Sequence, residues 1–434
     1  FEKRYILALS GGDIMELISI LVFLGVMVLI TTGKIDSTLS ALIGAAVILL
    51  TKVLSFNEAI KYVDFDTIGV LVGMMLFIAV LKQSGMFEYI AIKAAKKVNA
   101  DPWKIMIIFV IITAILSSCL DNVTTVLLVG PMTIAIARML EVNPVPYLLM
   151  LIFASNVGGT ATLIGDPPNI MIGSAAGLSF MDFLRNTGIA VVLVIAVQII
   201  MMKLLYKKYT LATEEAKAKV MALDESKSIT DARLMKIGIV LIVLIVIGFL
   251  AHDKLGVQPA VIALSAATVI MVASGKKAEH VIADVEWSTI LFFIALFIIV
   301  GGMEKTGVIA AISKAIISFT EGHEIITILV ILWASALVSS VLNNIPFVAA
   351  MIPLILSMKN QGMDVELLWW ALSLGACLGG NGTLIGASAN VVLSDISNKH
   401  GYPITFTSYL KVGFPFMILS VFVSTIVLLI KAYI

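Results

Sequence analysis

The feature that most restricts the fold of this chain is a series of apolar runs, each close to 20 residues long and flanked by polar or charged residues. A helix of about 20 apolar residues crosses the hydrocarbon core of a bilayer. Only 13% of the 434 residues are charged, whereas a soluble domain carries about 25%. The sequence therefore predicts a multi-pass, all-α membrane protein. The runs cover residues 14–32, 38–54, 66–82, 188–206, 235–251, 259–274, 287–303 and 412–430.

Two further regions, 104–177 and 325–397, are hydrophobic but interrupted by Gly, Pro, Asn, Asp and Thr. Backbone polar groups within lipid need internal hydrogen bonds, so non-helical backbone is tolerated there only inside protein or around a cavity. These interruptions therefore predict a polar chamber. They comprise two hairpin tips, Ser117–Thr125 and Ser339–Phe347, and two unwound loops, Asn156–Asn169 and Gly379–Asn390.

The chain also repeats itself at an offset of about 222 residues. Three segments of the first half match three of the second half in the same order, with shared polar residues, which indicates an internal duplication. The matched pairs are 63–85 with 285–307, 117–137 with 339–359, and 158–169 with 379–390.

The duplication predicts two inverted five-span repeats, each with a re-entrant helical hairpin and a discontinuous helix. This gives about ten transmembrane helices plus two hairpins. An odd number of crossings inverts the second copy, and inverted repeats with broken helices are typical of secondary transporters. The expected organisation is an N-terminal tail at 1–13, repeat 1 at 14–206, a charged linker at 207–233 and repeat 2 at 234–434.

The linker at 207–233 is the only long charged stretch, and we expect it to be solvated and partly helical. Placing it in the cytoplasm puts most Lys and Arg on that side, as the positive-inside rule requires. We therefore expect an integral protein of a prokaryotic inner or cell membrane, with the bilayer as its surroundings. The formal net charge of +1 gives no indication of a nucleic-acid partner.

Asp121 and Asp166 are the only acids in the four interruptions. A carboxylate at membrane depth is costly and usually functional, so either one is a candidate to bind a cation or take up a proton. The alternative for Asp121 is that it caps the helix after the hairpin tip. Asp166, which precedes two prolines, leaves both interpretations open.

Other polar residues of the interruptions are candidate ligands of a solute or ion. The asparagines either ligate or join helices by hydrogen bonds, and the threonines either ligate or bond to their own helix. Cys119 and Cys377 suit a soft ion or are ordinary small buried residues. No Lys or Arg lies in these segments, so helix N-termini would attract an anion there. The candidate substrate-binding residues are Asn122, Thr124, Thr162, Asp166, Asn169, Asn344, Asn381, Thr383 and Asn390.

The segments LDNVTTVLL, GDPPN and GACLGGNGTLIGASANVV resemble the ion transporter superfamily. The likeness is strongest to the melanosomal P protein branch, beside arsenite permeases and NhaD-type sodium/proton antiporters. It implies a scaffold domain, a transport domain with two re-entrant hairpins, an elevator-type mechanism and a homodimer.

The resemblance also implies cation-coupling positions, because sodium-coupled dicarboxylate relatives bind Na⁺ through a Ser-Asn-Thr-type motif at each hairpin tip and its facing loop. Here Asp121 stands in place of a Ser, Val123 and Ile345 replace the Thr, and the second tip has Asn343. One cation or proton site is therefore expected at Asp121, with Na⁺ held by Asp121, Asn122 and Gly158. The matching positions are Ser117, Asp121, Asn122 and Gly158 in the first half and Ser339, Asn343, Asn344 and Gly379 in the second.

Together these patterns predict a Na⁺- or H⁺-coupled secondary transporter of a small anion or oxyanion. Arsenite or antimonite efflux, Na⁺/H⁺ antiport and passive conduction through the hairpins are the alternatives. The chain has no nucleophile–base or metal constellation, so an enzyme is not expected. No cofactor is expected beyond Na⁺ or H⁺ as the coupling ion.

Overall fold

The computed structural model of the chain describes residues 11–209, 211–320 and 322–433. The predicted N-terminal tail, 1–13, lies outside the described residues except for its last three. Every regular element in the described part is a helix, and nine of these helices are long and apolar enough to cross a membrane. The predicted all-α membrane fold is therefore confirmed.

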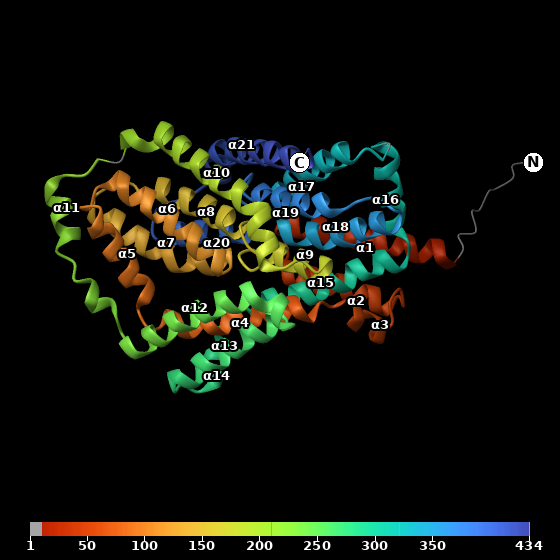
Figure 1. Cartoon of the computed structure of the whole chain (residues 1–434), viewed down its shortest axis with the longest axis horizontal. Helices are drawn as coiled ribbons and strands as arrows, with labels where there is room; N and C mark the ends of the chain where they lie inside the picture. Colours follow the sequence, from red (N-terminus) through yellow and green to blue (C-terminus); the bar gives the residue numbers. More distant parts are fainter. Residues whose placement is uncertain (1–10, 210, 321, 434) are drawn as a thin grey trace, which may run out of the picture. The chain divides into compact units, whose positions relative to one another are not determined.

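The helices follow one order twice along the chain (Figure 1). The first ten are α1 Gly11–Thr32, α2 Ser37–Leu50, α3 Phe56–Tyr62, α4 Phe65–Lys82, α5 Met86–Lys97, α6 Pro102–Cys119, α7 Asn122–Met139, α8 Val145–Gly159, α9 Pro167–Ala176 and α10 Phe180–Tyr206. The last ten are α12 Ala232–Leu255, α13 Pro259–Ser274, α14 Ala278–Ala283, α15 Trp287–Lys305, α16 Val308–Phe319, α17 Glu324–Leu342, α18 Asn344–Asn360, α19 Glu366–Gly379, α20 Ser388–Lys399 and α21 Phe406–Ala432.

Two spans begin earlier than the apolar runs at 188–206 and 412–430 predict. α10 starts at Phe180 because Ser179 and Asp182 form a capping box, and α21 starts at Phe406 because Thr405 and Ser408 do the same. A capping box satisfies amide groups that the first turn of a helix leaves without partners. Polar first turns therefore extend both helices beyond their apolar part.

The chain forms two compact units. The first unit contains residues up to Phe65 together with 287–327 and 349–365. In it α2 packs against α1 and α15, and a Cβ at Gly44 would lie 2.5 Å from Val26 and 2.8 Å from Ile299. Gly44 therefore lets α2 pack closely against side chains of these helices.

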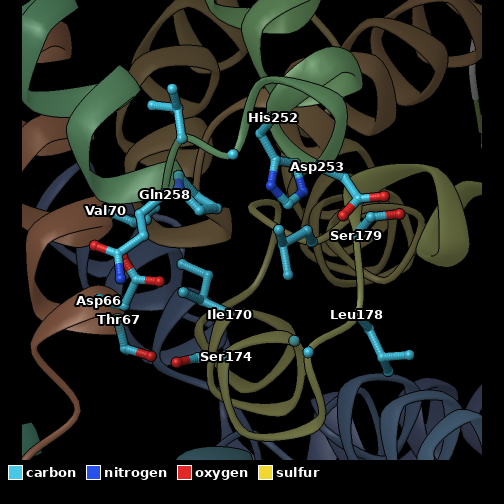
Figure 2. Close-up of a pocket in the computed structure, with 16 residues that line it drawn as sticks. Asp66, Thr67, Val70, Ile170, Ser174, Leu178, Ser179, His252, Asp253 and Gln258 are labelled. Carbon is cyan, nitrogen blue, oxygen red and sulfur yellow. The ribbon is translucent and has the colours of Figure 1, made fainter.

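The second unit contains residues 66–286, 328–348 and 366–434, and thus all four predicted interruptions. Within it α4 lies close to α13, because a Cβ at Gly73 would lie 2.7 Å from the backbone of Ala263. A cavity of about 260 Å³ lies where the first turns of α4 face α9 and the α12–α13 connection. His252 and Asp253 project into it from the end of α12, and Asp66 and Gln258 line its other side (Figure 2).

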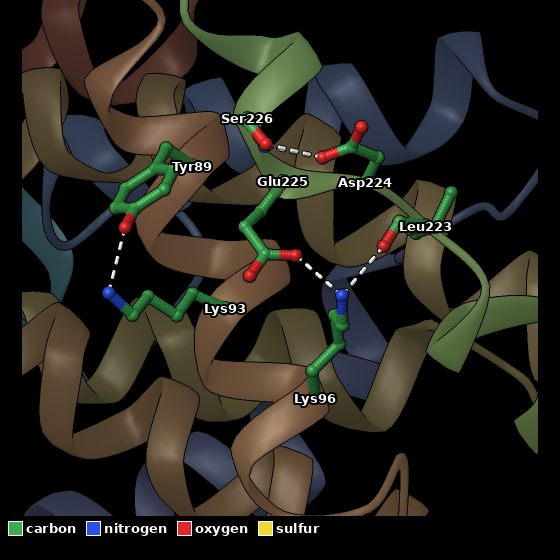
Figure 3. Close-up of polar contacts among 7 residues, drawn as sticks. All are labelled: Tyr89, Lys93, Lys96, Leu223, Asp224, Glu225 and Ser226. Atoms are coloured by element: carbon green, nitrogen blue, oxygen red, sulfur yellow. Dashed lines mark hydrogen bonds and ion pairs between the residues drawn. The ribbon is translucent and has the colours of Figure 1, made fainter.

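The charged linker is partly helical, as expected, but it packs on the second unit instead of being fully solvated. It contains the 3₁₀ turn η1 (Lys207–Tyr209), α11 (Glu214–Met221) and the 3₁₀ turn η2 (Glu225–Ser228). Ala216 and Val220 are buried. Lys96 of α5 donates to the Leu223 carbonyl at 2.8 Å and forms an ion pair with Glu225 at 2.5 Å (Figure 3).

A second contact joins the end of the linker to the corner between α4 and α5. The Thr230 amide donates to the Ser84 carbonyl at 3.0 Å. Gly85 has a φ of +77°, and a Cβ there would lie 1.7 Å from the Ser228 carbonyl oxygen. Only glycine allows this approach.

The Lys96–Glu225 pair predicts how the linker responds to charge. The hydrogen bond from Lys96 lowers the pKa of Glu225. The pair therefore stabilises the docked linker fully above the ordinary glutamate pKa, and this contribution is lost as the pH falls through the lowered pKa of Glu225. Lys96→Glu or Glu225→Lys should accelerate hydrogen–deuterium exchange in 213–231 by about two- to fivefold, the range for a partly exposed pair.

The double charge swap should restore slow exchange. Glu214→Gln is the matched control, because Glu214 pairs with Lys217 of the same helix and not with α5. Equal exchange in the parent and both single variants would show that this pair does not hold the linker.

Candidate functional site

The first hairpin, α6–α7, turns at Leu120 and Asp121. Asp121 accepts a hydrogen bond from the Thr124 amide at 2.8 Å and another from the Thr124 hydroxyl at 2.5 Å. It is thus the N-cap of α7, and its cap satisfies an amide that the helix itself leaves unbonded. Both Asp121 and Thr124 are half-buried.

The second hairpin, α17–α18, turns at Asn343 alone, which has a φ of +64°. Asparagine tolerates this left-handed conformation better than most residues. Its side-chain oxygen accepts from the Ile345 amide at 3.2 Å, and its side-chain nitrogen donates to Ser388 at 3.3 Å. Asn343 therefore closes its tip much as Asp121 closes the first.

The discontinuous spans are α8–α9 and α19–α20. Their non-helical stretches cover only 160–166 and 380–387, so the predicted loops 156–169 and 379–390 are too long. Gly158, Gly159 and Gly379 are helical, and Gly159 and Gly379 are the last residues of α8 and α19. A Cβ at Gly158 would lie 2.2 Å from the Ala114 carbonyl oxygen, and one at Gly379 would lie 2.6 Å from that of Ala336. These glycines allow close helix packing.

The hydroxyl groups predicted as ligands attach the tips to neighbouring backbone. Ser117 donates to the Ser155 carbonyl at 2.6 Å, and Thr162 donates to the Ser118 carbonyl at 2.5 Å. The second half has the same bonds, from Ser339 to Ala376 and from Thr383 to Ser340. These four hydroxyls thus hold each tip against its facing helix and loop.

Asn169 and Asn390 occupy equivalent places and hold the two loops. The Asn169 amide donates to the Thr162 carbonyl at 2.9 Å, and the Asn390 amide donates to the Thr383 carbonyl at 2.9 Å. The side-chain oxygen of Asn169 also accepts from Ser373 at 2.7 Å.

Asp166 lies where the two hairpin tips meet. Its carboxylate accepts from Asn122 of the first tip at 3.3 Å and from Asn344 of the second tip at 3.3 and 3.4 Å. Asp166 is 1% exposed, Asn122 3% and Asn344 2%. Among the residues that the structure describes, no ion pair reaches Asp166.

Three helices begin at this point. Asn122 and Asn344 are the first residues of α7 and α18, and Asp166 directly precedes α9. The N-terminus of a helix carries partial positive charge and amide groups without intrahelical partners. The site is therefore favourable for negative charge although it contains no Lys or Arg.

Asn156 connects these groups, and it was not among the predicted site residues. Its oxygen accepts from Asn122 at 3.1 Å, and its nitrogen donates to Asn381 and Asn390 at 2.9 Å each. In the sequence, the indication of such a role is an amide side chain within an apolar segment, two residues before Gly158. From the sequence alone, Asn156 is expected only as the start of a loop.

Three predicted residues lie apart from the hydrogen-bonded group formed by Asp166, Asn122, Asn344 and Asn156. Asp121 and Thr124 bond to each other, and Asn343 faces Ser388. The structure therefore turns Asn122 toward Asp166 and leaves Asp121 to its own helix. The Na⁺ site expected at Asp121, Asn122 and Gly158 stays a prediction.

The sequence matches a family model described as a citrate transporter over residues 27–375. An uncharacterized transporter of Mycobacterium bovis is 41% identical over 407 residues, covering 92% of this chain and 94% of that protein. The human P protein is 32% identical and aligns with 91% of this chain and 57% of its own length. The resemblance to the P protein branch is therefore confirmed.

The fold is similar to that of the YdaH transporter of Alcanivorax borkumensis, whose crystal structure has a topology described as unusual. The TM-score is 0.61 with 13% identity, covering 95% of this chain and 97% of that one. At this identity the likeness concerns the fold alone.

The close contact at Gly158 predicts that one added methyl group lowers the stability of the protein. Gly158→Ala should lower the thermal unfolding temperature, because its Cβ would overlap the α6 backbone and overpacking costs about 1–3 kcal/mol. Unfolding in detergent can be followed with a thiol-reactive dye, since Cys119 is half-buried and Cys377 is buried.

Gly188→Ala is the matched control, because a Cβ there would have its nearest neighbour at 3.5 Å. Alanine favours a helix interior over glycine by about 0.5–1 kcal/mol, so this variant should unfold at the parent temperature or slightly above it. If Gly158→Ala were equally stable, the close packing of α8 on α6 would be wrong.

Proposed function

This chain is a membrane transporter of the CitMHS citrate transporter family, and we propose that it moves a small anion or oxyanion together with Na⁺ or H⁺. The observation that carries the proposal is Asp166, a buried carboxylate held by asparagines from both hairpin tips. An ionised carboxylate that is removed from water needs a compensating charge. Among the described residues, amides and helix N-termini supply it.

Coupling follows from competition for these N-termini. A bound anion would be attracted to the starts of α7, α18 and α9, where the Asp166 carboxylate already lies. Two negative charges that lie close together repel strongly in a site of low dielectric constant. The anion therefore binds well only after Asp166 has taken up a proton or Na⁺, so that ion and anion move together.

A second candidate is exchange of Na⁺ for H⁺ at Asp166 without an anion. It is favoured by the absence of Lys and Arg from the four predicted interruptions. The two functions differ in one respect: symport requires the anion for net cation flux, whereas exchange does not. In both, an elevator-type movement carries the site across the membrane.

Flux into proteoliposomes tests the proposal. Citrate, inorganic phosphate and arsenite are supplied separately, with and without inward Na⁺ and pH gradients. For the transported solute, an inward gradient of the coupling ion should increase the initial rate of uptake at least tenfold. Rates that no gradient changes would refute coupling, and cation exchange in the absence of every anion would favour the second candidate.

Asp166→Asn should abolish the dependence on the cation gradient, because an amide neither takes up the proton nor compensates Na⁺. The control is Asp36→Asn in the first unit, where Asp36 caps α2. This replacement retains a capping side chain, and coupling should be unchanged. Full coupling in Asp166→Asn would assign the cation site elsewhere.

A further inference from the structure

A second cavity of about 400 Å³ lies against the last turns of α4, the start of α5 and the first turns of α7. Its polar lining consists of Lys82, Gln83, Glu88, Thr124, Asp284 and Glu286. Water occupies about 30 Å³ per molecule in the liquid, so a partly hydrated monovalent cation fits in this space.

One wall of this cavity, at Gln83, adjoins the end of the linker. Gln83 lines the cavity, and the Gln83 carbonyl accepts a hydrogen bond from Thr230 at the end of the linker. The cavity of Figure 2 contacts the opposite end of α4, at Asp66, Thr67 and Val70. The two cavities are therefore separate.

The inner end of the linker-side cavity reaches the first hairpin tip. Thr124 lines the cavity, and its hydroxyl donates to Asp121 at 2.5 Å. Asn122 follows Asp121 directly and bonds to Asp166. The chain thus leads from the cavity through Thr124 and Asp121 to Asn122, whose side chain contacts the buried carboxylate.

The charge of the lining favours cations. Three acids of the lining, Glu88, Asp284 and Glu286, outnumber Lys82 and the adjacent Lys276, whose Nζ donates to the Gln83 side chain. Asp121 adds a carboxylate behind Thr124. The Oε2 atom of Glu88 is buried, and no hydrogen-bond partner for it exists in the described part of the chain. A cleft lined by charges of one sign concentrates the opposite ion and repels ions of its own sign.

We propose that the linker-side cavity is the access vestibule of the coupling cation, and that Thr124 and Asp121 form the first binding station on its way to Asp166. This inference rests on the proposed function for the identity of its ion. The lining repels the anionic solute, so the solute must reach the site by another route. Glu88 and Asp284 then determine how well the cation competes for the station.

Thiol labelling tests the vestibule without any transport measurement. Ala79 lines the cavity from α4 and is half-buried, so Ala79→Cys in a Cys119→Ser background places a thiol inside it. A cationic methanethiosulfonate should label this thiol at least fivefold faster than an anionic one in detergent. Labelling of the background protein is subtracted.

In this background, removing an acid and removing the lysine of the lining should change the ratio of cationic to anionic labelling in opposite directions. Glu88→Gln and Asp284→Asn lower the ratio of cationic to anionic labelling about two- to fivefold, and Lys82→Gln raises it. A folding defect cannot produce opposite effects of this kind. Ser174→Cys in the Figure 2 cavity is the control thiol, and its ratio should not respond to Asp284→Asn.

The transport readout is the concentration of cation that gives half-maximal uptake. Glu88→Gln and Asp284→Asn should raise it severalfold, Lys82→Gln should lower it, and added salt should reduce all three effects. The vestibule proposal is wrong if both reagents label Ala79→Cys equally or if neither labels it. It is also wrong if the charge variants leave the ratio of cationic to anionic labelling unchanged. Absence of cation coupling in the parent would instead refute the proposed function, since labelling does not depend on it.

Discussion

The buried carboxylate of Asp166 is the constraint on which the rest of the second unit depends. Its hydrogen bonds come from Asn122 and Asn344, residues that begin two helices far apart in the sequence. A charge at such a place is tolerated only where surrounding dipoles are fixed in advance. The tips, the short loops and the serine and threonine contacts supply that rigidity.

The two halves hold their tips in the same way but differ at the centre. Ser117 and Ser339 bond to corresponding carbonyl groups, as do Thr162 and Thr383. Ala387 precedes α20, whereas Asp166 precedes the corresponding α9. A duplicated framework therefore surrounds one fully buried acid, Asp166, which suits one coupling ion for each transport step.

Much of the fold follows from apolar run length, because a bilayer accepts only helices of nearly fixed length. The runs at 66–82 and 259–274 agree with α4 and α13 within one residue. The hairpin tips and Asp166 were predicted from Gly, Pro, Asn and Asp in apolar surroundings. Loop lengths were overestimated because Gly158 permits helix packing where sequence reasoning expected a break.

Three features could not be predicted from the sequence. Asp121 and Asp166 are both acids in interruptions. Only their contacts distinguish them, because Thr124 caps Asp121 whereas Asn122 and Asn344 bond to Asp166. Asn156 connects both halves through side chains more than 200 positions away, a relation that local patterns do not contain. The docked linker depends on Gly85 and Lys96, which belong to another segment.

An experimental density map of the protein at saturating Na⁺ and at low pH is the decisive test of the Asp166 site. We expect the side chain of Asp166 within hydrogen-bond distance of those of Asn122 and Asn344, with an ion beside it in the Na⁺ condition if Na⁺ is the coupling ion. A map in which the two tip asparagines are separated and Asp166 faces lipid or open water in both conditions would contradict it.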